Sequence, residues 1–319
     1  MSINRKRRVL IIFPALEERF YYKAQSLDVD GVIIDLEDGI ALSHKEEARL
    51  RMKNFLAKYP IQDKELIIRI NSFRSGYGLR DLEVALECEP NSIMYPKTEE
   101  PNEIEQLDNI LSENQARLGC SKQIDLIPLI ETPIGLLRAD KILSTSQRVT
   151  ATVLGTEDLC SAFMTERKPI TEMPLLLYGV ASLSFVAKAL RISLIDGVFP
   201  CIGEESLSAL HRECLTLRSL GAVGKVAIHP SQISIIREMF SETKSEISKL
   251  VEIIASLSER GKKEGITLIR HGNRLYGSPM FTWAKNLFSC VEREGNMNLE
   301  LEKIKSFLET SGFECGGVK

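Results

Sequence analysis

The sequence predicts an α/β protein whose main domain is a (β/α)₈ barrel, the architecture also called a TIM barrel. Over roughly residues 8–240, eight short apolar runs alternate with helix-like segments, which matches the number of units and the size of such a barrel. The runs are apolar almost throughout, as expected for parallel strands covered on both faces. An open doubly wound sheet is the alternative, but neither a GxGxxG nor a GxxxxGKS/T loop follows any of the runs.

Strands and helices are predicted in alternation along the chain, with helix bounds assigned after every strand except the fifth. Strands are expected at residues 8–13, 31–36, 65–70, 92–95, 127–130, 149–154, 193–199 and 225–228. Helices are expected at residues 17–27, 43–59, 79–88, 101–118, 174–190, 205–220 and 231–240. Ser43 and Glu46 fit a capping box, which predicts that the second helix begins at Ser43.

The barrel is expected to occupy residues 1–240, and residues 241–319 are expected to form a C-terminal arm. Helix-like segments of the arm lie at 245–264, 279–293 and 299–308, and a hairpin-like stretch at 267–278 turns at Gly272 and Asn273. The arm lacks enough alternating apolar pattern to form its own core. We therefore expect it to act as a helical lid or oligomerisation arm.

Composition excludes several classes of protein. The net charge of −3 argues against general nucleic-acid binding, and no apolar run approaches the roughly 18–20 residues that a membrane-spanning helix needs. The basic start is followed by a short apolar run that ends at Glu17 and Glu18, so we do not expect a signal peptide. The seven cysteines are scattered and include no CxxC pair, which favours reduced thiols in a cytoplasmic protein.

Polar and charged residues follow most of the predicted strands. In chain order they are Glu37, Asp38, Arg69, Asn71, Lys97, Glu131, Asp158 and His229. In a parallel barrel these positions meet at the C-terminal face, where barrel enzymes carry out their chemistry. Two carboxylates such as Glu131 and Asp158 can hold Mg²⁺ while water and substrate oxygens supply the other ligands, and Arg69 could fix a substrate carboxylate or carbonyl.

The same residues also admit a purely structural interpretation, in which acids and bases at the strand ends pair with one another. Glu37 could pair with Arg69, Asp38 could cap the following helix, and Lys97 could extend into solvent. His229, which precedes a proline, is more typical of a structural hydrogen-bonding histidine than of a general base.

Short motifs add to the functional interpretation. They are VIIDLEDGI with a following KEEAR, LIIRIN, MYPKTE, LIPLIETPIGLL, VLGTEDL, IDGVF and GKVAIHPSQI. With these motifs in this order on the predicted strands, the chain resembles citrate lyase β-subunit-like proteins of the HpcH/HpaI aldolase family. The resemblance covers about residues 8–240 and extends loosely into the arm.

The resemblance implies a TIM barrel that binds Mg²⁺ and makes or breaks a carbon–carbon bond next to a carbonyl. In that family the glutamate of the ETP motif and the aspartate of the EDL motif hold the metal, which assigns Glu131 and Asp158 as its ligands. The arginine of the RIN-like motif contacts the substrate, which assigns Arg69. We expect Lys97 and Glu131 to bind the substrate as well.

The catalytic residues expected from the resemblance are Arg69, Glu37 and Asp38, of which the two acids order metal-bound water. Many members of the family cleave thioesters such as citryl-, malyl- or citramalyl-CoA. Cleavage leaves an enolate, whose charge a metal ion and a nearby arginine can stabilise. We therefore expect a Mg²⁺-dependent carbon–carbon lyase that binds an acyl-CoA or oxo-acid substrate and forms a homo-oligomer, a trimer or hexamer.

Departures from the family pattern lie on the acyl-CoA side of the site. Family members of the CoA-lyase type carry an aspartate in an arm motif like RMVDAP and supply it to a neighbouring subunit, whereas this chain has Gly277 at that place. Residues 181–184 read ASLS where arginines are common, and Phe199-Pro200-Cys201 replaces a more polar stretch. Two alternatives thus stay open: an aldolase for a free 4-hydroxy-2-oxo acid, and a catalytically reduced member that binds a metabolite.

Overall fold

The computed structural model describes residues 5–118, 123–241, 248, 252–253, 256, 268–271 and 273–277. The chain divides into two compact units, Met1–Phe240 and Ser241–Lys319.

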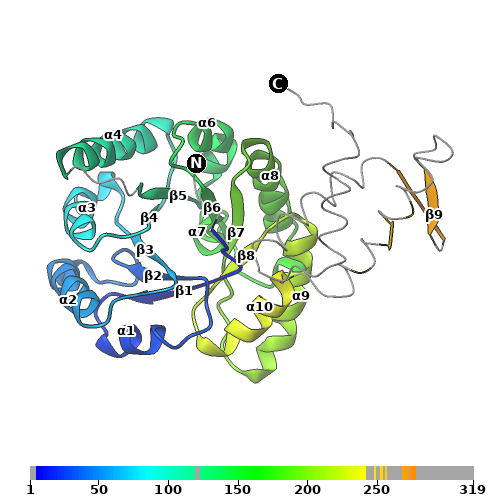
Figure 1. Cartoon of the computed structure of the whole chain (residues 1–319), viewed down its shortest axis with the longest axis horizontal. Helices are drawn as coiled ribbons and strands as arrows, with labels where there is room; N and C mark the ends of the chain where they lie inside the picture. Colours follow the sequence, from blue (N-terminus) through cyan, green and yellow to red (C-terminus); the bar gives the residue numbers. More distant parts are fainter. Residues whose placement is uncertain are drawn as a thin grey trace. The chain divides into compact units, whose positions relative to one another are not determined.

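The first unit is a closed barrel of eight parallel strands, which follow one another in chain order until β8 pairs with β1 (Figure 1). The strands are β1 (Val9–Pro14), β2 (Gly31–Asp35), β3 (Glu65–Arg69), β4 (Ser92–Tyr95), β5 (Asp125–Ile130), β6 (Ala151–Leu154), β7 (Ser193–Val198) and β8 (Gly224–Ala227). The helices are α1 (Glu18–Ala24), α2 (Lys45–Lys58), α3 (Gly78–Glu87), α4 (Pro101–Leu118), α5 (Pro133–Leu137), α6 (Ala139–Ser144), α7 (Thr156–Ala162), α8 (Pro174–Leu190), α9 (Leu207–Ser219) and α10 (Ile233–Phe240). The predicted (β/α)₈ barrel is confirmed.

The barrel has two apolar layers because successive side chains of a strand point to opposite faces. On β2, Ile33 belongs to the inner cluster, whereas Val32 and Ile34 pack in the outer layer with the helices. The inner cluster consists of Leu10, Ile33, Ile67, Met94, Ile127, Leu129, Ala151, Val153, Ile195 and Val226. Because apolar side chains fill the interior, polar groups gather at its ends. We call the end at the amino termini of the strands the base and the end at their carboxyl termini the mouth.

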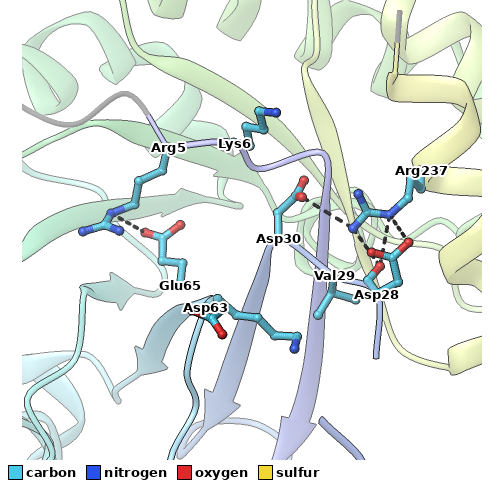
Figure 2. A pocket seen from close by; sticks show the side chains of 9 residues that line it. Arg5, Lys6, Asp28, Val29, Asp30, Asp63, Glu65 and Arg237 are labelled. Carbon is cyan, nitrogen blue, oxygen red and sulfur yellow. Dashed lines mark hydrogen bonds and ion pairs between the residues drawn. The ribbon is translucent and has the colours of Figure 1, made fainter. Parts of the chain in front are cut away.

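Ion pairs line the base of the barrel. Arg7 donates from Nε and Nη2 to the two carboxylate oxygens of Glu65, both at 2.7 Å. Beside this pair lies a cavity of about 590 Å³. In it, Arg5 Nε lies 3.9 Å from Glu65 Oε1 and Arg237 Nη2 lies 3.5 Å from Asp30 Oδ1 (Figure 2). Acids and arginines thus face one another across the base.

The capping box predicted from Ser43 and Glu46 is wrong. α2 begins at Lys45, after a short 3₁₀ turn at Leu42–His44, and no side chain caps it. The hydroxyl of Ser43 instead bonds with His44 Nδ1 at 3.0 Å. The side chain of Lys45 is buried and binds main-chain carbonyls that follow β2, and this contact sets the start of the helix.

In the second unit, β9 (Ile269–His271) and β10 (Arg274–Tyr276) form an antiparallel pair with Arg274 opposite His271. This confirms the predicted hairpin. The helices predicted at 279–293 and 299–308 lie outside the described residues, as does nearly all of the one at 245–264, so the role of the arm stays a prediction. Among the described helices, none has the length and apolarity to cross a membrane.

Candidate active site at the mouth of the barrel

Asp35 organises the loop that carries Glu37 and Asp38. It is the last residue of β2 and is buried. Its Oδ1 accepts the main-chain N–H of Glu37 at 2.8 Å, and its Oδ2 accepts that of Gly39 at 2.9 Å. The same two oxygens accept from Nε and Nη2 of Arg69 at 2.7 and 2.8 Å. Asp35 therefore fixes both the acidic loop and the direction of the arginine.

Arg69 keeps one amino group for other partners. Its Nη1 lies 3.4 Å from Glu37 Oε2. Burial opposes the charge of the guanidinium, but the carboxylates of Asp35, Glu37 and Glu131 outweigh burial and raise the pKa of Arg69. Pairing with Glu37, which the structural interpretation expected, is thus secondary to pairing with Asp35. Asp35 was not predicted from the sequence, because this residue follows a run of apolar residues in the same strand. Its role could have been inferred from strand register, because Asp35 at the end of β2 pairs with Arg69 at the end of β3.

Lys97 contacts acids with both its backbone and its side chain. Its φ of +48° lies in the left-handed region, which is costly for a residue other than glycine. In this conformation its N–H donates to Glu131 Oε1 at 2.7 Å. Its Nζ donates to Glu37 Oε1 at 2.5 Å and to Asp38 Oδ2 at 2.9 Å. Lys97 therefore joins three of the predicted site acids and does not simply extend into solvent.

Glu131 and Asp158 follow neighbouring strands. Glu131 comes directly after β5 and is 3% exposed, and Asp158 lies half-buried in the first turn of α7. Burial, and then the charges of Asp158 and Glu37, raise the pKa of Glu131 well above its usual value. Gly155 allows β6 to approach this carboxylate, because a Cβ at that position would lie 2.4 Å from the Cβ of Glu131. The contacts described here therefore do not fully neutralise the negative charge of the Glu131 carboxylate.

Lys45 and Asn71 support the acidic loop from behind. Lys45 Nζ donates to the carbonyl oxygens of Leu36 and Glu37, both at 2.7 Å, and to Asn71 Oδ1 at 2.9 Å. Asn71 Nδ2 donates to Leu36 O at 2.7 Å. Asn71, predicted as a strand-end polar residue, therefore holds the loop. Sequence reasoning missed Lys45 because lysines at the start of a charged helix are usually exposed.

His229 serves the backbone near it. The side chain is exposed, and its Nδ1 accepts the main-chain N–H of Ser231 at 3.2 Å, which caps the turn Pro230–Gln232. This agrees with the structural interpretation of His229. The predicted residues that the structure joins by hydrogen bonds, ion pairs or charge are Glu37, Asp38, Arg69, Lys97, Glu131 and Asp158.

The donor set of the mouth fits a hard dication. Within the described part of the chain, no three Asp, Glu, His or Cys side chains are arranged to hold a metal by themselves, but Mg²⁺ needs only one or two carboxylates when water and substrate supply the other ligands. Glu37 Oε2 is buried and accepts no hydrogen bond from the described residues. The carboxylates of Glu131 and Asp158, with this oxygen of Glu37 nearby in charge, are therefore suited to the Mg²⁺ that the sequence predicts.

Comparisons with known proteins agree with the motifs. The model of the HpcH/HpaI aldolase/citrate lyase family matches residues 8–230. The mitochondrial citramalyl-CoA lyase of Rattus norvegicus is 32% identical over 89% of this chain and 86% of its own length. The citrate lyase subunit beta of Haemophilus influenzae is 27% identical over 88% of this chain and 94% of its own length.

A solved structure shares the fold. CitE from Mycobacterium tuberculosis, in complex with magnesium, acetoacetate and coenzyme A, has a TM-score of 0.74 and 22% identity, covering 90% of this chain and 98% of the other. The predicted lyase activity agrees with the family and with the names of these relatives. Magnesium is part of the CitE complex, and for this chain the Mg²⁺ cofactor is a proposal. The chain belongs to the HpcH/HpaI aldolase/citrate lyase family.

Proposed function

We propose that this protein is a Mg²⁺-dependent lyase that cleaves a carbon–carbon bond in a hydroxyacyl-CoA thioester of the citryl-, malyl- or citramalyl-CoA type. The observation that carries the proposal is the placement of Arg69, which Asp35 holds beside Glu37 and near Glu131. An oriented guanidinium thus lies next to carboxylates whose charge is incompletely balanced. Such a site can bind a dication and an anionic substrate together.

Each side chain has a role in this proposal. Glu131 and Asp158 would hold the metal, and Arg69 would bind carboxylate or carbonyl oxygens of the substrate. Lys97 would keep Glu131 in place through its N–H and would contact the substrate with its ammonium group. When bound, Mg²⁺ supplies positive charge that stabilises an enolate.

The cleavage step moves one proton and one electron pair. The substrate hydroxyl loses its proton, and the bond between the hydroxyl-bearing carbon and the α-carbon of the thioester breaks. The hydroxyl-bearing carbon becomes a carbonyl, and the electron pair of the broken bond leaves as the acyl-CoA enolate, which then takes a proton at its α-carbon. Burial raises the pKa of Glu37, which brings it closer to the neutral range in which a carboxylate works as a base. Glu37, with Asp38 beside it, is the proposed proton carrier.

The thioester part of the proposal is supported by the names of the relatives, citramalyl-CoA lyase and citrate lyase subunit beta. One residue favours other chemistry. Gly277 follows β10 at the place of the aspartate that the resemblance expects, and glycine cannot transfer a proton. The second candidate is therefore an aldolase for a free 4-hydroxy-2-oxo acid, or a metabolite-binding member with reduced catalysis.

A substrate panel tests the proposal. Purified protein would be assayed with citryl-, malyl- and citramalyl-CoA and with several 4-hydroxy-2-oxo acids, each with MgCl₂ and again with EDTA. Cleavage of a hydroxyacyl-CoA that EDTA abolishes would support the lyase. Cleavage of oxo acids alone would favour the aldolase, and binding without turnover would favour the reduced member.

We also infer a homo-oligomer, a trimer or hexamer, in the cytoplasm. The arm predicted for oligomerisation supports the first inference. The free cysteines of the described residues, Cys88, Cys160, Cys201 and Cys214, support a reducing compartment. Light scattering of the purified protein tests the oligomer, and cell fractionation tests the compartment, for which mitochondria are the competing outcome because the rat relative is mitochondrial.

A further inference from the structure

Four charged side chains form a buried cluster outside the mouth. We call Arg167, Asp196, Glu213 and Lys225 the helix-layer cluster, because it joins β7 and β8 to α9 and to the loop after α7. Glu213 is the centre: its Oε1 accepts from Arg167 Nη2 at 2.8 Å and from Lys225 Nζ at 2.9 Å, and its Oε2 accepts from Arg167 Nη1 at 3.1 Å. Lys225 also donates to Asp196. All four side chains are at most 3% exposed.

The helix-layer cluster is balanced but is a poor source of stability. Burial opposes the charge on Glu213, yet Lys225 and Arg167 outweigh burial and lower the pKa of Glu213 to about 2, so Glu213 stays ionised. Buried ion pairs of this kind are often replaceable by apolar residues at no cost in stability. Their geometry, in contrast, is strict, because each partner must keep its hydrogen bonds. The cluster is thus better suited to fixing positions than to strengthening the fold.

Two segments are fixed by this cluster. Arg167 Nε donates to the hydroxyl of Thr156 at 3.2 Å, and Glu213 Oε2 accepts the main-chain N–H of Ile170 at 2.7 Å. Thr156 is the first residue of α7 and is 1% exposed. The start of α7 is therefore tied, through one arginine, to the layer between the strands and α9.

The tied segment lies between the two predicted metal ligands. Gly155 packs directly on Glu131, and Asp158 comes two residues after Thr156. On its other side, the turn between β6 and α7 packs closely against β7. A Cβ on Gly197 of β7 would lie 2.6 Å from the carbonyl oxygen of Leu154, the last residue of β6. A shift of this turn would change the position of Asp158 relative to Glu131.

We propose that Arg167, aligned by Glu213, is a positioning residue that fixes the first turn of α7 and with it the Asp158 carboxylate for a divalent cation. This inference rests on the metal site of the proposed function. The helix-layer cluster does not touch the substrate or the metal; it acts through Thr156. Outer groups that orient metal ligands typically change metal affinity by about 10–100-fold when they are removed.

A pair of matched variants tests the inference. Thr156→Val removes the hydroxyl that Arg167 holds and keeps the shape of the side chain. Thr152→Val is the control, because Thr152 lies buried on the adjoining strand β6 and its hydroxyl also makes one bond, to Pro128 O at 2.9 Å. The double variant Arg167→Met, Glu213→Met removes the tie and leaves Lys225 and Asp196 as a balanced pair. The probe is MnCl₂ alone, with free Mn²⁺ followed by EPR and Mg²⁺ added as competitor, since both ions prefer oxygen ligands in octahedral geometry.

We expect Thr156→Val and the folded double variant to bind Mn²⁺ about tenfold more weakly, while Thr152→Val binds it as the wild type does. Equal Mn²⁺ affinity in Thr156→Val, Thr152→Val and the wild type would overturn the inference and leave the proposed function intact. If the double variant does not fold, Thr156→Val decides alone. A wild-type protein that binds neither ion would overturn the metal site of the proposed function and this inference together.

Discussion

The base and the mouth of the barrel use the same residue types but balance their charges differently. At the base, Glu65 accepts two bonds from Arg7 and a third from Ser92 Oγ at 2.5 Å, and Arg7 also lies 3.5 Å from Asp125. At the mouth, Arg69 donates its hydrogen bonds to Asp35, and Glu131 accepts only a main-chain N–H, from Lys97, among the described residues. The base pairs its central carboxylate fully, whereas the mouth leaves Glu131 without a side-chain cation in hydrogen-bond contact among the described residues.

This difference separates structural ion pairs from a binding site. A buried acid that is fully paired keeps its charge and holds strands together. A buried acid with too few partners is destabilising, and such groups persist where function requires them. Because (β/α)₈ enzymes carry out their chemistry at the carboxyl ends of the strands, the unbalanced end is also the end where a ligand is expected.

The largest expected effect is on metal binding. Glu131→Gln and Asp158→Asn should each abolish measurable Mg²⁺ binding with the fold intact, because loss of an anionic ligand removes most of the attraction for a hard dication. Glu131→Gln should also raise the melting temperature, since an amide can still accept the N–H of Lys97 but carries no buried charge.

The control at the base is Glu65→Gln. It should leave Mg²⁺ binding unchanged and cost about 3 kcal/mol of stability or more, because Arg7 would remain buried without its charged partner. Calorimetric titration with MgCl₂ and thermal melts measure both properties. Unchanged Mg²⁺ affinity in both Glu131→Gln and Asp158→Asn would mean that the carboxylates at the mouth, like those at the base, serve only the structure.

The next effect is on turnover. Arg69→Lys should lower kcat/KM by about 10²-fold or more on whichever substrate the panel identifies, because lysine keeps the charge but loses the planar fork that binds Asp35 and the substrate. Arg7→Lys makes the same change at the base and should lower the melting temperature with kcat/KM unchanged. Wild-type kinetics for Arg69→Lys would reduce Arg69 to a partner of the acids.

The sequence was enough to place the strands and therefore the residues at their ends. Glu37, Arg69, Lys97 and Glu131 end or follow four strands in chain order, so the barrel brings them to one face. What periodicity does not give is which of several acids each cation binds. That choice depends on strand register and on backbone angles such as the positive φ of Lys97.

Two supporting residues show why the rest was missed. Asp35 looks like an interruption of an apolar strand, and only its register opposite Arg69 reveals its role. Lys45 looks like part of a solvated helix, and only the path of the chain after β2 shows that it binds buried carbonyls. Asp35 acts through a partner 34 positions away, and Lys45 acts through the fold of the loop between β2 and α2. Local periodicity encodes neither contact.

A smaller gain in activity is expected from the arm. If the missing acid limits hydroxyacyl-CoA cleavage, Gly277→Asp should raise turnover by about tenfold or more, because a positioned acid or base typically contributes about 10²–10⁴-fold. Melting temperature and turnover would be measured together, since aspartate would be strained if Gly277 needs a backbone angle that favours glycine. A well-folded variant that binds acyl-CoA without faster turnover would leave substrate choice as the explanation of Gly277.

The smallest expected effect is a difference in pH dependence between the two ends. At the base, burial opposes the charge on Asp30, but Arg8 and Arg237 outweigh burial and lower the pKa of Asp30. Figure 2 shows Arg237 beside Asp30. A lowered pKa means that Asp30 contributes stability above the ordinary aspartate pKa of about 3.9 and loses it as the pH falls through the lower folded value. The raised pKa of Glu131 has the opposite sign. Its contribution favours the folded state below the ordinary glutamate pKa of about 4.3 and is lost as the pH rises through the folded value.

Asp30→Asn should therefore lower the free energy of unfolding at pH 7 and reduce the loss of stability below about pH 4. Glu131→Gln should raise the free energy of unfolding at pH 7 and increase the loss of stability between pH 7 and about pH 4, because the wild type regains stability there as Glu131 takes up a proton. Urea unfolding of the metal-free protein between pH 3 and pH 8 measures both, with EDTA present so that ligand binding does not contribute. The comparison of the two ends fails if both variants change stability at pH 7 in the same direction, because the mouth would then balance its charges as the base does.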